Sequence, residues 1–396
     1  MRIIKGNIIT PYEIIRNGAV VIKNGFIDDI IRNFNAYEST DMTDYGNSYI
    51  MPGLIDIHNH GGAGFDYMDA TMEAFSAISK YLASHGVTSA LATTATAPVK
   101  TTLAFLRNFR KMSDSVTNGC RLIGVHLEGP YLSVRNKGAQ PEEYLLKPDE
   151  NGYGFILEYS DIVKHITISP ELPGMYKMIR DLKNAGIIIS GGHDDAVDYE
   201  IFPAIDAGMT HTTHIYCAMS SLPKRNALRY SGLCEIALTD DRLTTEMIAD
   251  NHHVPPILAK LIYKCKGADK VCIVSDCLRA GGLKDDGSIY YLGQSGEEGQ
   301  PIIIYDGVAM LTDKSRFAGS VQALDKMIKN LVNDSDIPLQ DAVRMASLTP
   351  ASVIGINGET GSIEPRKRAD ICIMDNDLNV IETILDGKTI YTHDGK

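Results

Sequence analysis

The sequence predicts an α/β fold, a (β/α)8 TIM-like barrel with a small β-sandwich domain formed by both chain ends. Three observations predict it. Short apolar runs alternate about eight times with segments of helical spacing, both ends of the chain consist of short strand-like runs and turns, and histidines and carboxylates fall at the ends of the apolar runs. Strand ends converge at one mouth of a barrel, so side chains placed there can meet in one site.

Eight runs are the expected barrel strands. Most are continuously apolar, as strands buried on both faces are. In chain order they are 54–58 (LIDIH), 87–93 (VTSALAT), 121–127 (RLIGVHL), 165–169 (HITIS), 186–190 (GIIIS), 209–214 (MTHTTH), 245–249 (TEMIA) and 270–276 (KVCIVSD).

Helices are expected between most of these strands, because apolar residues recur there with helical spacing. The clearest segments are 71–86, 101–112, 174–186 and 255–267. Several of the expected helices end at a glycine suited to a helix C-terminus, at Gly86, Gly186, Gly208 and Gly267.

The two ends of the chain differ from the middle. Residues 1–51 and 358–396 consist of short strands and turns, and remote termini often lie close in space. We therefore expect these two segments to form the small domain and residues 52–357 to form the barrel.

Composition limits the possible partners. The chain has 396 residues, 44% of them hydrophobic, which suffices for one large core and a small one. A formal net charge of −12 argues against nucleic acid or an anionic membrane as the main partner. No apolar leader or stretch of membrane-spanning length is apparent, and seven cysteines without paired spacing suit reduced thiols, so we expect a cytoplasmic protein.

Histidines and a carboxylate at strand ends predict a metal centre. His58 and His60 are two residues apart, so on an extended strand both side chains point to the same side. Glu128 directly follows the third run, His193 lies just past the fifth, and His214 ends the sixth. A single buried histidine is more often a hydrogen-bonded core residue, but the repeated placement at strand ends favours ligands of a cation.

Asp276, at the end of the eighth run, is the candidate proton shuttle. A carboxylate beside activated water can take its proton and return it to a leaving group. The alternative is an aspartate that only caps the turn after a strand.

A set of motifs gives a resemblance to a known family. The segments DIHNHG, HLEGPYLS, KGAQ, GGHDDA, THTTHIYCAM, ADNHHV, VSDCLRAGG and FAGS occur in the order seen in N-acetylglucosamine-6-phosphate deacetylases, which belong to the amidohydrolase superfamily. The resemblance extends over nearly the whole chain, including the β domain split between the two ends.

The resemblance implies roles for the metal-binding residues. Glu128, His193 and His214 match the principal ligands, and His58 with His60 match a pair used for a second metal. We therefore expect one or two divalent cations per subunit, zinc first, with iron, manganese and cobalt as alternatives.

The resemblance also implies substrate contacts. Asp276 matches the general base and acid, Arg225 and His253 match positions that contact the sugar phosphate, and Ala218 matches a position whose backbone helps to bind it. It further suggests a homodimer in which the partner subunit completes the phosphate pocket. An arginine in a polar loop, as Arg225 is, would otherwise be read as solvated.

Two departures from the family pattern lie near the substrate. Gln140 stands where the family usually has histidine, and it can donate a hydrogen bond but cannot carry a proton. Cys217 replaces an asparagine and is a poorer hydrogen-bond partner. Both leave the hydrolytic chemistry better supported than the identity of the substrate.

The expected activity is metal-dependent hydrolysis of an acetamide, converting N-acetylglucosamine-6-phosphate to glucosamine-6-phosphate and acetate. The same chemistry on N-acetylgalactosamine-6-phosphate or on a non-phosphorylated N-acyl amine is the alternative, and a non-catalytic barrel is a third. A cyclic-amide hydrolase is disfavoured, because the family that such an enzyme would resemble bridges its two metals with a modified lysine after the fourth strand. Here Ser169, Pro170 and Glu171 occupy that end, and Lys164 lies at the other.

Overall fold

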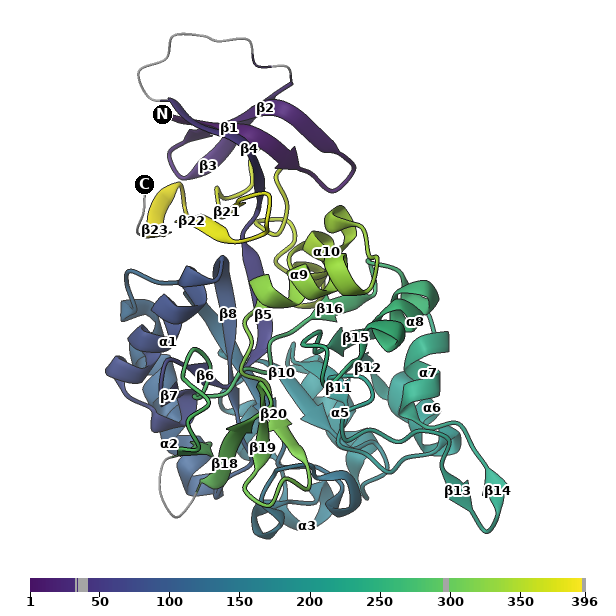
Figure 1. The fold of residues 1–396 in the computed structure, drawn as a ribbon. Helices are drawn as coiled ribbons and strands as arrows, with labels where there is room; N and C mark the ends of the chain where they lie inside the picture. Colours follow the sequence, from purple (N-terminus) through teal and green to yellow (C-terminus); the bar gives the residue numbers. More distant parts are fainter. Residues whose placement is uncertain (33, 35–41, 295–298, 394–396) are drawn as a thin grey trace.

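The eight predicted barrel strands all form. The computed structural model describes residues 1–32, 34, 42–294 and 299–393. Within it, one sheet has the order β16-β15-β12-β11-β10-β9-β8-β5, and every neighbouring pair is parallel. The strands are β5 (Leu54–Asn59), β8 (Val87–Thr94), β9 (Arg121–Glu128), β10 (Val163–Ile168), β11 (Ile188–Gly191), β12 (Met209–Thr212), β15 (Thr244–Met247) and β16 (Val271–Ile273) (Figure 1).

Backbone hydrogen bonds join the first and last barrel strands at their C-terminal ends. The Asp276 N–H donates to the His58 carbonyl at 2.9 Å, and the His60 N–H donates to the Cys277 carbonyl at 3.0 Å. The segments that carry the predicted metal ligands and the predicted proton shuttle are therefore fixed directly to each other.

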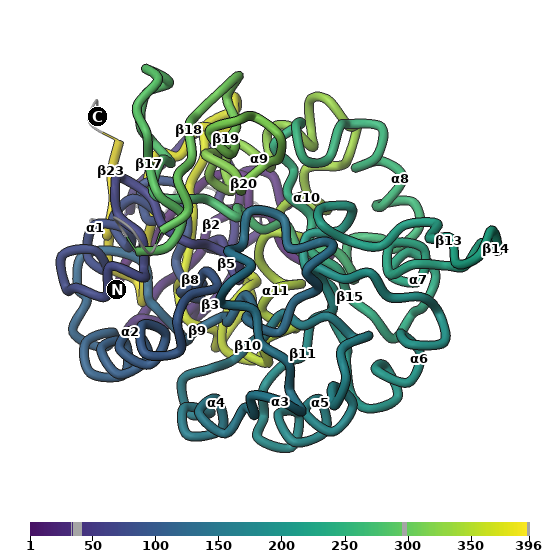
Figure 2. Tube along the Cα trace, turned by 90° about the horizontal axis from the view of Figure 1, so that it is seen from below, coloured from purple at the N-terminus to yellow at the C-terminus, as the bar shows by residue number. Residues whose placement is uncertain are grey.

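Helices surround the sheet, as the view along the barrel shows (Figure 2). α5 is typical, since it buries Met175, Met178, Ile179 and Leu182, which lie on one face of a helix. Gly208 and Gly267 are the C-caps of α6 and α8, with φ of 130° and 68°, as predicted. The helices are α1 (Met72–Ser84), α2 (Val99–Met112), α3 (Pro148–Asn151), α4 (Gly154–Leu157), α5 (Met175–Asn184), α6 (Asp198–Ala207), α7 (Leu233–Thr239), α8 (Pro256–Lys266), α9 (Leu324–Asp334), α10 (Leu339–Met345) and α11 (Leu348–Val353).

Strands from both ends of the chain pair in one seven-stranded sheet of order β23-β22-β21-β4-β1-β2-β3. Its two halves share an apolar cluster that includes Ile4, Ile27 and Ile371, so they face each other as the layers of a small sandwich (Figure 1). The pairing of β4 with β21 joins the two ends, while the exact domain boundaries stay a prediction. The strands are β1 (Arg2–Ile9), β2 (Ile14–Lys23), β3 (Phe26–Ile31), β4 (Met42–Pro52), β21 (Ile371–Met374), β22 (Val380–Leu385) and β23 (Lys388–Thr392).

A four-stranded antiparallel sheet between β16 and α9 was absent from the sequence-based prediction. It has the order β17-β18-β19-β20 and packs through a small cluster that includes Leu278, Leu292 and Ile302. An isolated parallel β-bridge between Cys277 and Ser320, made by backbone hydrogen bonds, attaches this inserted sheet to the end of the barrel. Its strands are β17 (Ile289–Leu292), β18 (Gln300–Tyr305), β19 (Val308–Leu311) and β20 (Phe317–Gly319).

Short elements complete the fold. The hairpin of β13 (Lys224–Arg225) and β14 (Leu228–Arg229) projects from the barrel (Figure 1). β6 (Gly61–Gly62) pairs with β7 (Phe65–Asp66), and 3-10 helices span Tyr67–Asp69, Ser113–Ser115, Val134–Asn136 and Glu142–Tyr144. Across the described residues, each helix is too short or too polar to cross a bilayer.

Candidate metal centre and active site

The Glu128 carboxylate lies at the centre of the site. It ends β9, is 3% exposed, and is approached by four imidazoles. Its Oε1 lies 3.1 Å from His193 Nε2, 3.0 Å from His214 Nε2 and 3.6 Å from His58 Nε2, and its Oε2 lies 3.3 Å from His60 Nε2. The five predicted metal ligands therefore converge from the ends of four strands, with His58 and His60 both at the end of β5.

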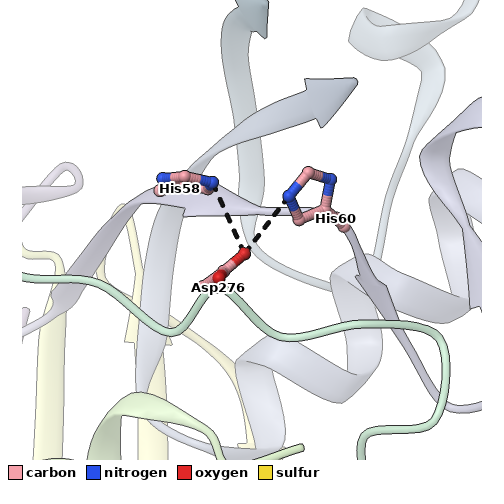
Figure 3. A group of neighbouring side chains, drawn as sticks. All are labelled: His58, His60 and Asp276. Atoms are coloured by element: carbon pink, nitrogen blue, oxygen red, sulfur yellow. Dashed lines mark ion pairs between the residues drawn. The ribbon is translucent and has the colours of Figure 1, made fainter. Parts of the chain in front are cut away.

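Asp276 joins this cluster from the segment after β16. Its Oδ1 lies 3.5 Å from His58 Nε2 and 3.2 Å from His60 Nε2 (Figure 3). Its φ of 45° is in the left-handed region, as are the φ angles of His193 (50°) and His214 (27°). Each such non-glycine residue costs on the order of 1–3 kcal/mol, and such strain is typical of functional sites.

The donor set fits a divalent cation. Three imidazole–carboxylate groupings with ligand atoms within 4.8 Å of one another occur among the described residues, and two of them contain His58, with His60 and Asp276 or with Glu128 and His214. The His58 Nε2 atom is buried and has no hydrogen-bond partner among the described residues, although it faces two carboxylates. A buried polar atom without a partner is costly, and a cation shared with these carboxylates would satisfy it.

The charges of the cluster are balanced by protons. Burial lowers the pKa of His58 and His60, but the neighbouring carboxylates outweigh it and raise these pKa values to about 9 and about 10. Burial likewise raises the pKa of Glu128, yet hydrogen bonds from His193, His214 and His60 hold it well below its ordinary value. Because imidazoles bind a cation in their neutral form, a bound cation would replace these protons.

Glu246, in β15, was not predicted as a site residue. It is fully buried, and its Oε2 accepts hydrogen bonds from His58 Nδ1 at 2.8 Å and from the His214 backbone N–H at 3.1 Å. With Nδ1 protonated for this bond, His58 presents Nε2 to the centre. A glutamate inside the apolar run 245–249 was the available signal, because a buried charge needs a partner.

Further histidines fill the barrel interior behind the centre. His126 and His165 stack with ring centroids 4.0 Å apart, and His211 Nε2 lies 3.5 Å from Glu246 Oε1. Burial, the largest influence, lowers the pKa of His165 to about 3, so this ring is neutral.

A cavity of about 350 Å³ opens above the cluster, within the range of roughly 300–1,000 Å³ for small-molecule sites. It is lined by the predicted groups Glu128, His193, His214 and Asp276 and by the predicted substrate contacts Gln140, Cys217, Ala218 and His253. The inserted sheet contributes Leu292, Phe317, Ala318 and Gly319, and the turn before β20 contributes Arg316.

Both ends of the Gln140 side-chain amide are engaged. Its Nε2 donates to Glu128 Oε2 at 2.5 Å, and its Oε1 accepts from the Thr96 N–H at 2.8 Å. Burial raises the pKa of the Cys217 thiol, which therefore stays neutral.

The two predicted phosphate contacts lie in different places. His253 lines the cavity, and its Nδ1 pairs with Asp250 Oδ2 at 2.7 Å. Arg225 does not line the cavity of its own chain, because it lies on the projecting hairpin and donates to Asp195 Oδ2 at 3.0 Å.

The fold and the site together define a class. Imidazoles and carboxylates that converge at the C-terminal mouth of a (β/α)8 barrel, around a small-molecule cavity, are the features of a metal-dependent barrel hydrolase. The sequence model of the amidohydrolase family matches residues 49–390, so the chain belongs to this family. Its members are metal-dependent hydrolases of carbon–nitrogen bonds.

Named relatives are similar over nearly the full length. The chain is 34% identical over 390 residues to N-acetylglucosamine-6-phosphate deacetylase of Bacillus subtilis (strain 168), covering 97% of this chain and 95% of the relative. It is 31% identical over 348 residues to N-acetylgalactosamine-6-phosphate deacetylase of Escherichia coli O157:H7, covering 88% and 89%.

A solved structure resembles the whole chain. It is an aspartate-to-alanine mutant of N-acetyl-D-glucosamine-6-phosphate deacetylase from Mycobacterium smegmatis, in complex with N-acetyl-D-glucosamine-6-phosphate. Its TM-score is 0.89 at 27% identity, and the match covers 99% of both chains.

Proposed function

We propose that the protein is a deacetylase that hydrolyses the acetamide of an N-acetyl amino sugar 6-phosphate, with N-acetylglucosamine-6-phosphate as substrate and glucosamine-6-phosphate and acetate as products. The observation that carries the proposal is the buried Glu128 carboxylate surrounded by four imidazoles, with Asp276 beside them, at the floor of a cavity. The similarity to named deacetylases supports the substrate class.

The cofactor in this proposal is one or two divalent cations. Zinc is the expected metal, and iron, manganese or cobalt are the alternatives. Glu128, His193 and His214 would hold one, and His58 with His60 would hold the second. When bound, such a cation supplies Lewis acidity, which makes water nucleophilic at neutral pH and polarises a carbonyl.

The chain's own groups account for the proton transfers. Asp276 takes a proton from the attacking water, whose oxygen bonds to the acetamide carbon. In this proposal Gln140 Nε2–H exchanges its hydrogen bond to Glu128 for one to the oxygen that gains charge. Asp276 then gives its proton to the sugar nitrogen as the carbon–nitrogen bond breaks, so that acetate and the free amine leave.

Specific observations support an alternative substrate. Gln140 and Cys217 line the cavity at positions that depart from the family pattern, and one relative is named for N-acetylgalactosamine-6-phosphate. N-acetylgalactosamine-6-phosphate, or a non-phosphorylated N-acyl amine, is therefore the alternative. A non-catalytic barrel is disfavoured, since a scaffold has no use for the strained, buried ligand set.

The assembly and location also remain proposals. We propose a cytoplasmic homodimer in which Arg225 reaches the substrate of the partner subunit. Its position on the projecting hairpin, outside the cavity of its own chain, supports this arrangement.

The test is acetate release by the cation-loaded protein from the 6-phosphates of N-acetylglucosamine and N-acetylgalactosamine and from both unphosphorylated sugars. We expect turnover of a 6-phosphate, with the glucosamine form preferred. No acetate from any of the four sugars, with bound metal verified, would contradict the proposed substrate class.

A further inference from the structure

The cavity lining carries an uneven set of charges. Glu128 and Asp276 are two carboxylates at its floor, and its histidines belong to the metal cluster or pair with Asp250. Among the described residues that line the cavity, Arg316 is the only lysine or arginine. Within the described part of its own chain, the cavity therefore has one permanent cation.

The Arg316 guanidinium is available for a ligand. The residue is exposed, and its side chain makes no hydrogen bond or ion pair with any described residue, although it interacts electrostatically with Asp313 of the same turn. The Arg225 guanidinium, by contrast, already donates to both the backbone and the side chain of Asp195. Of these two arginines, Arg316 is the one free to bind an anion.

The position of Arg316 suits the end of the substrate away from the acetamide. The acetamide has to reach the buried floor, where Glu128 is 3% and Asp276 7% exposed. Arg316 enters the cavity from the turn between β19 and β20, next to Phe317, whose ring packs on His253 with centroids 4.7 Å apart. Arg316 therefore lines the same cavity as His253 and directly precedes the residue whose ring packs on that histidine.

Electrostatics favours an anion beside Arg316. The two carboxylates at the floor are balanced within the metal cluster, so among the described lining residues the Arg316 guanidinium is the permanent charge left to attract an anionic substrate group. Guanidinium binds phosphate through two parallel hydrogen bonds, which adds geometric selectivity to the charge.

We infer that Arg316 is a specificity-determining residue that binds the phosphate group of the substrate within the same subunit. The inference rests on the proposed function, since it names the group that distinguishes a sugar phosphate from the free sugar. It assigns this role to the inserted sheet rather than to the β13–β14 hairpin alone.

The test compares Arg316→Gln and Arg316→Lys with Lys314→Gln and with Arg225→Gln. Lys314 is a matched control, because it is an exposed cation of the same turn whose ammonium lies 3.5 Å from the Tyr305 ring centroid, outside the cavity lining. The readout is the ratio of kcat/KM for N-acetylglucosamine-6-phosphate to kcat/KM for N-acetylglucosamine.

We expect Arg316→Gln to lower this ratio about 10- to 100-fold, mainly through KM, as for the loss of charge-assisted hydrogen bonds. Arg316→Lys should recover part of the ratio, and Lys314→Gln should keep the wild-type ratio. A ratio within threefold of wild type in Arg316→Gln overturns the inference, as does a collapse confined to Arg225→Gln.

Calorimetry separates this inference from the proposed function. Glucosamine-6-phosphate and glucosamine are titrated into the cation-loaded wild type and Arg316→Gln, with no turnover needed. Phosphate-dependent binding that is lost in the variant supports the role of Arg316 even if no sugar is deacetylated. Equal binding by both proteins overturns it even if the deacetylase activity is established.

Discussion

Glu246 offers a direct test of how the metal centre is organised. Its Oε2 accepts hydrogen bonds from the His58 ring and from the His214 backbone, so one carboxylate fixes two predicted ligands from different strands. Replacing it by alanine would leave both donors buried without an acceptor. The His58 ring would then lose the bond that selects its tautomer.

The magnitude follows from these bonds. Loss of a hydrogen bond to a charged group costs about 1.5–3 kcal/mol. At about 1.4 kcal/mol per factor of ten, this corresponds to roughly 10- to 150-fold weaker cation binding, comparable to other outer-shell changes. Glu246→Gln keeps an accepting oxygen without the charge, so we expect it to lie near the lower limit and Glu246→Ala near the upper one.

The assay is competition between the protein and a chelator for zinc, with circular dichroism to confirm folding. Asp325→Asn is the matched control, because Asp325 is a buried carboxylate that pairs with a histidine Nδ1, that of His85 at 3.0 Å, outside the metal cluster. Folded Glu246→Ala with a zinc affinity within twofold of wild type would refute the reasoning. An equal loss in Asp325→Asn would point to a general effect of burying an amide.

Two further predictions concern the cavity and pH. Gly138→Ala should weaken zinc binding several-fold more than Gly152→Ala in the same competition assay. Both glycines have similar φ (60° and 69°), but only at Gly138 would the new Cβ meet a predicted ligand, at 3.1 Å from His193 Cε1. Equal zinc affinities of the two variants would contradict the prediction. Burial, and after it the neighbouring Asp194 carboxylate, raises the pKa of Glu171 to about 8. Above about pH 4.5 the folded state therefore keeps a proton that the unfolded state has released. The free energy of unfolding then falls with rising pH by at most about 1.4 kcal/mol per pH unit. Glu171→Gln should therefore gain stability relative to wild type between pH 5 and pH 8 in urea unfolding, and an unchanged difference would contradict this.

The barrel was predictable because its strands are buried on both faces. The run 87–93 shows no polar–apolar alternation and is buried throughout, and the residues at the ends of such runs had to meet at one mouth. The same logic brought Glu128 and Asp276 to the same two histidines, His58 and His60, although the two carboxylates lie far apart in the sequence.

The inserted sheet and the partners of single side chains were not predictable in this way. β17 and β19 are only four residues long and partly buried, and apolar runs this short do not by themselves indicate a separate sheet. Arg316 follows a polar turn and resembles any solvated arginine until the fold places it in the cavity. The role of Glu246 required knowledge of the closed barrel, because it depends on a contact to His58 of β5, a strand that is not adjacent to β15 in the sheet.

The central claim is that Asp276 moves the proton during acetamide hydrolysis at this metal centre. The most direct measurement is acetate release from N-acetylglucosamine-6-phosphate by Asp276→Asn, with bound metal measured in the same samples. We predict wild-type metal content with turnover lowered about 10²- to 10⁴-fold, the usual contribution of a general acid and base. Near-wild-type acetate release by the metal-loaded variant would contradict the account.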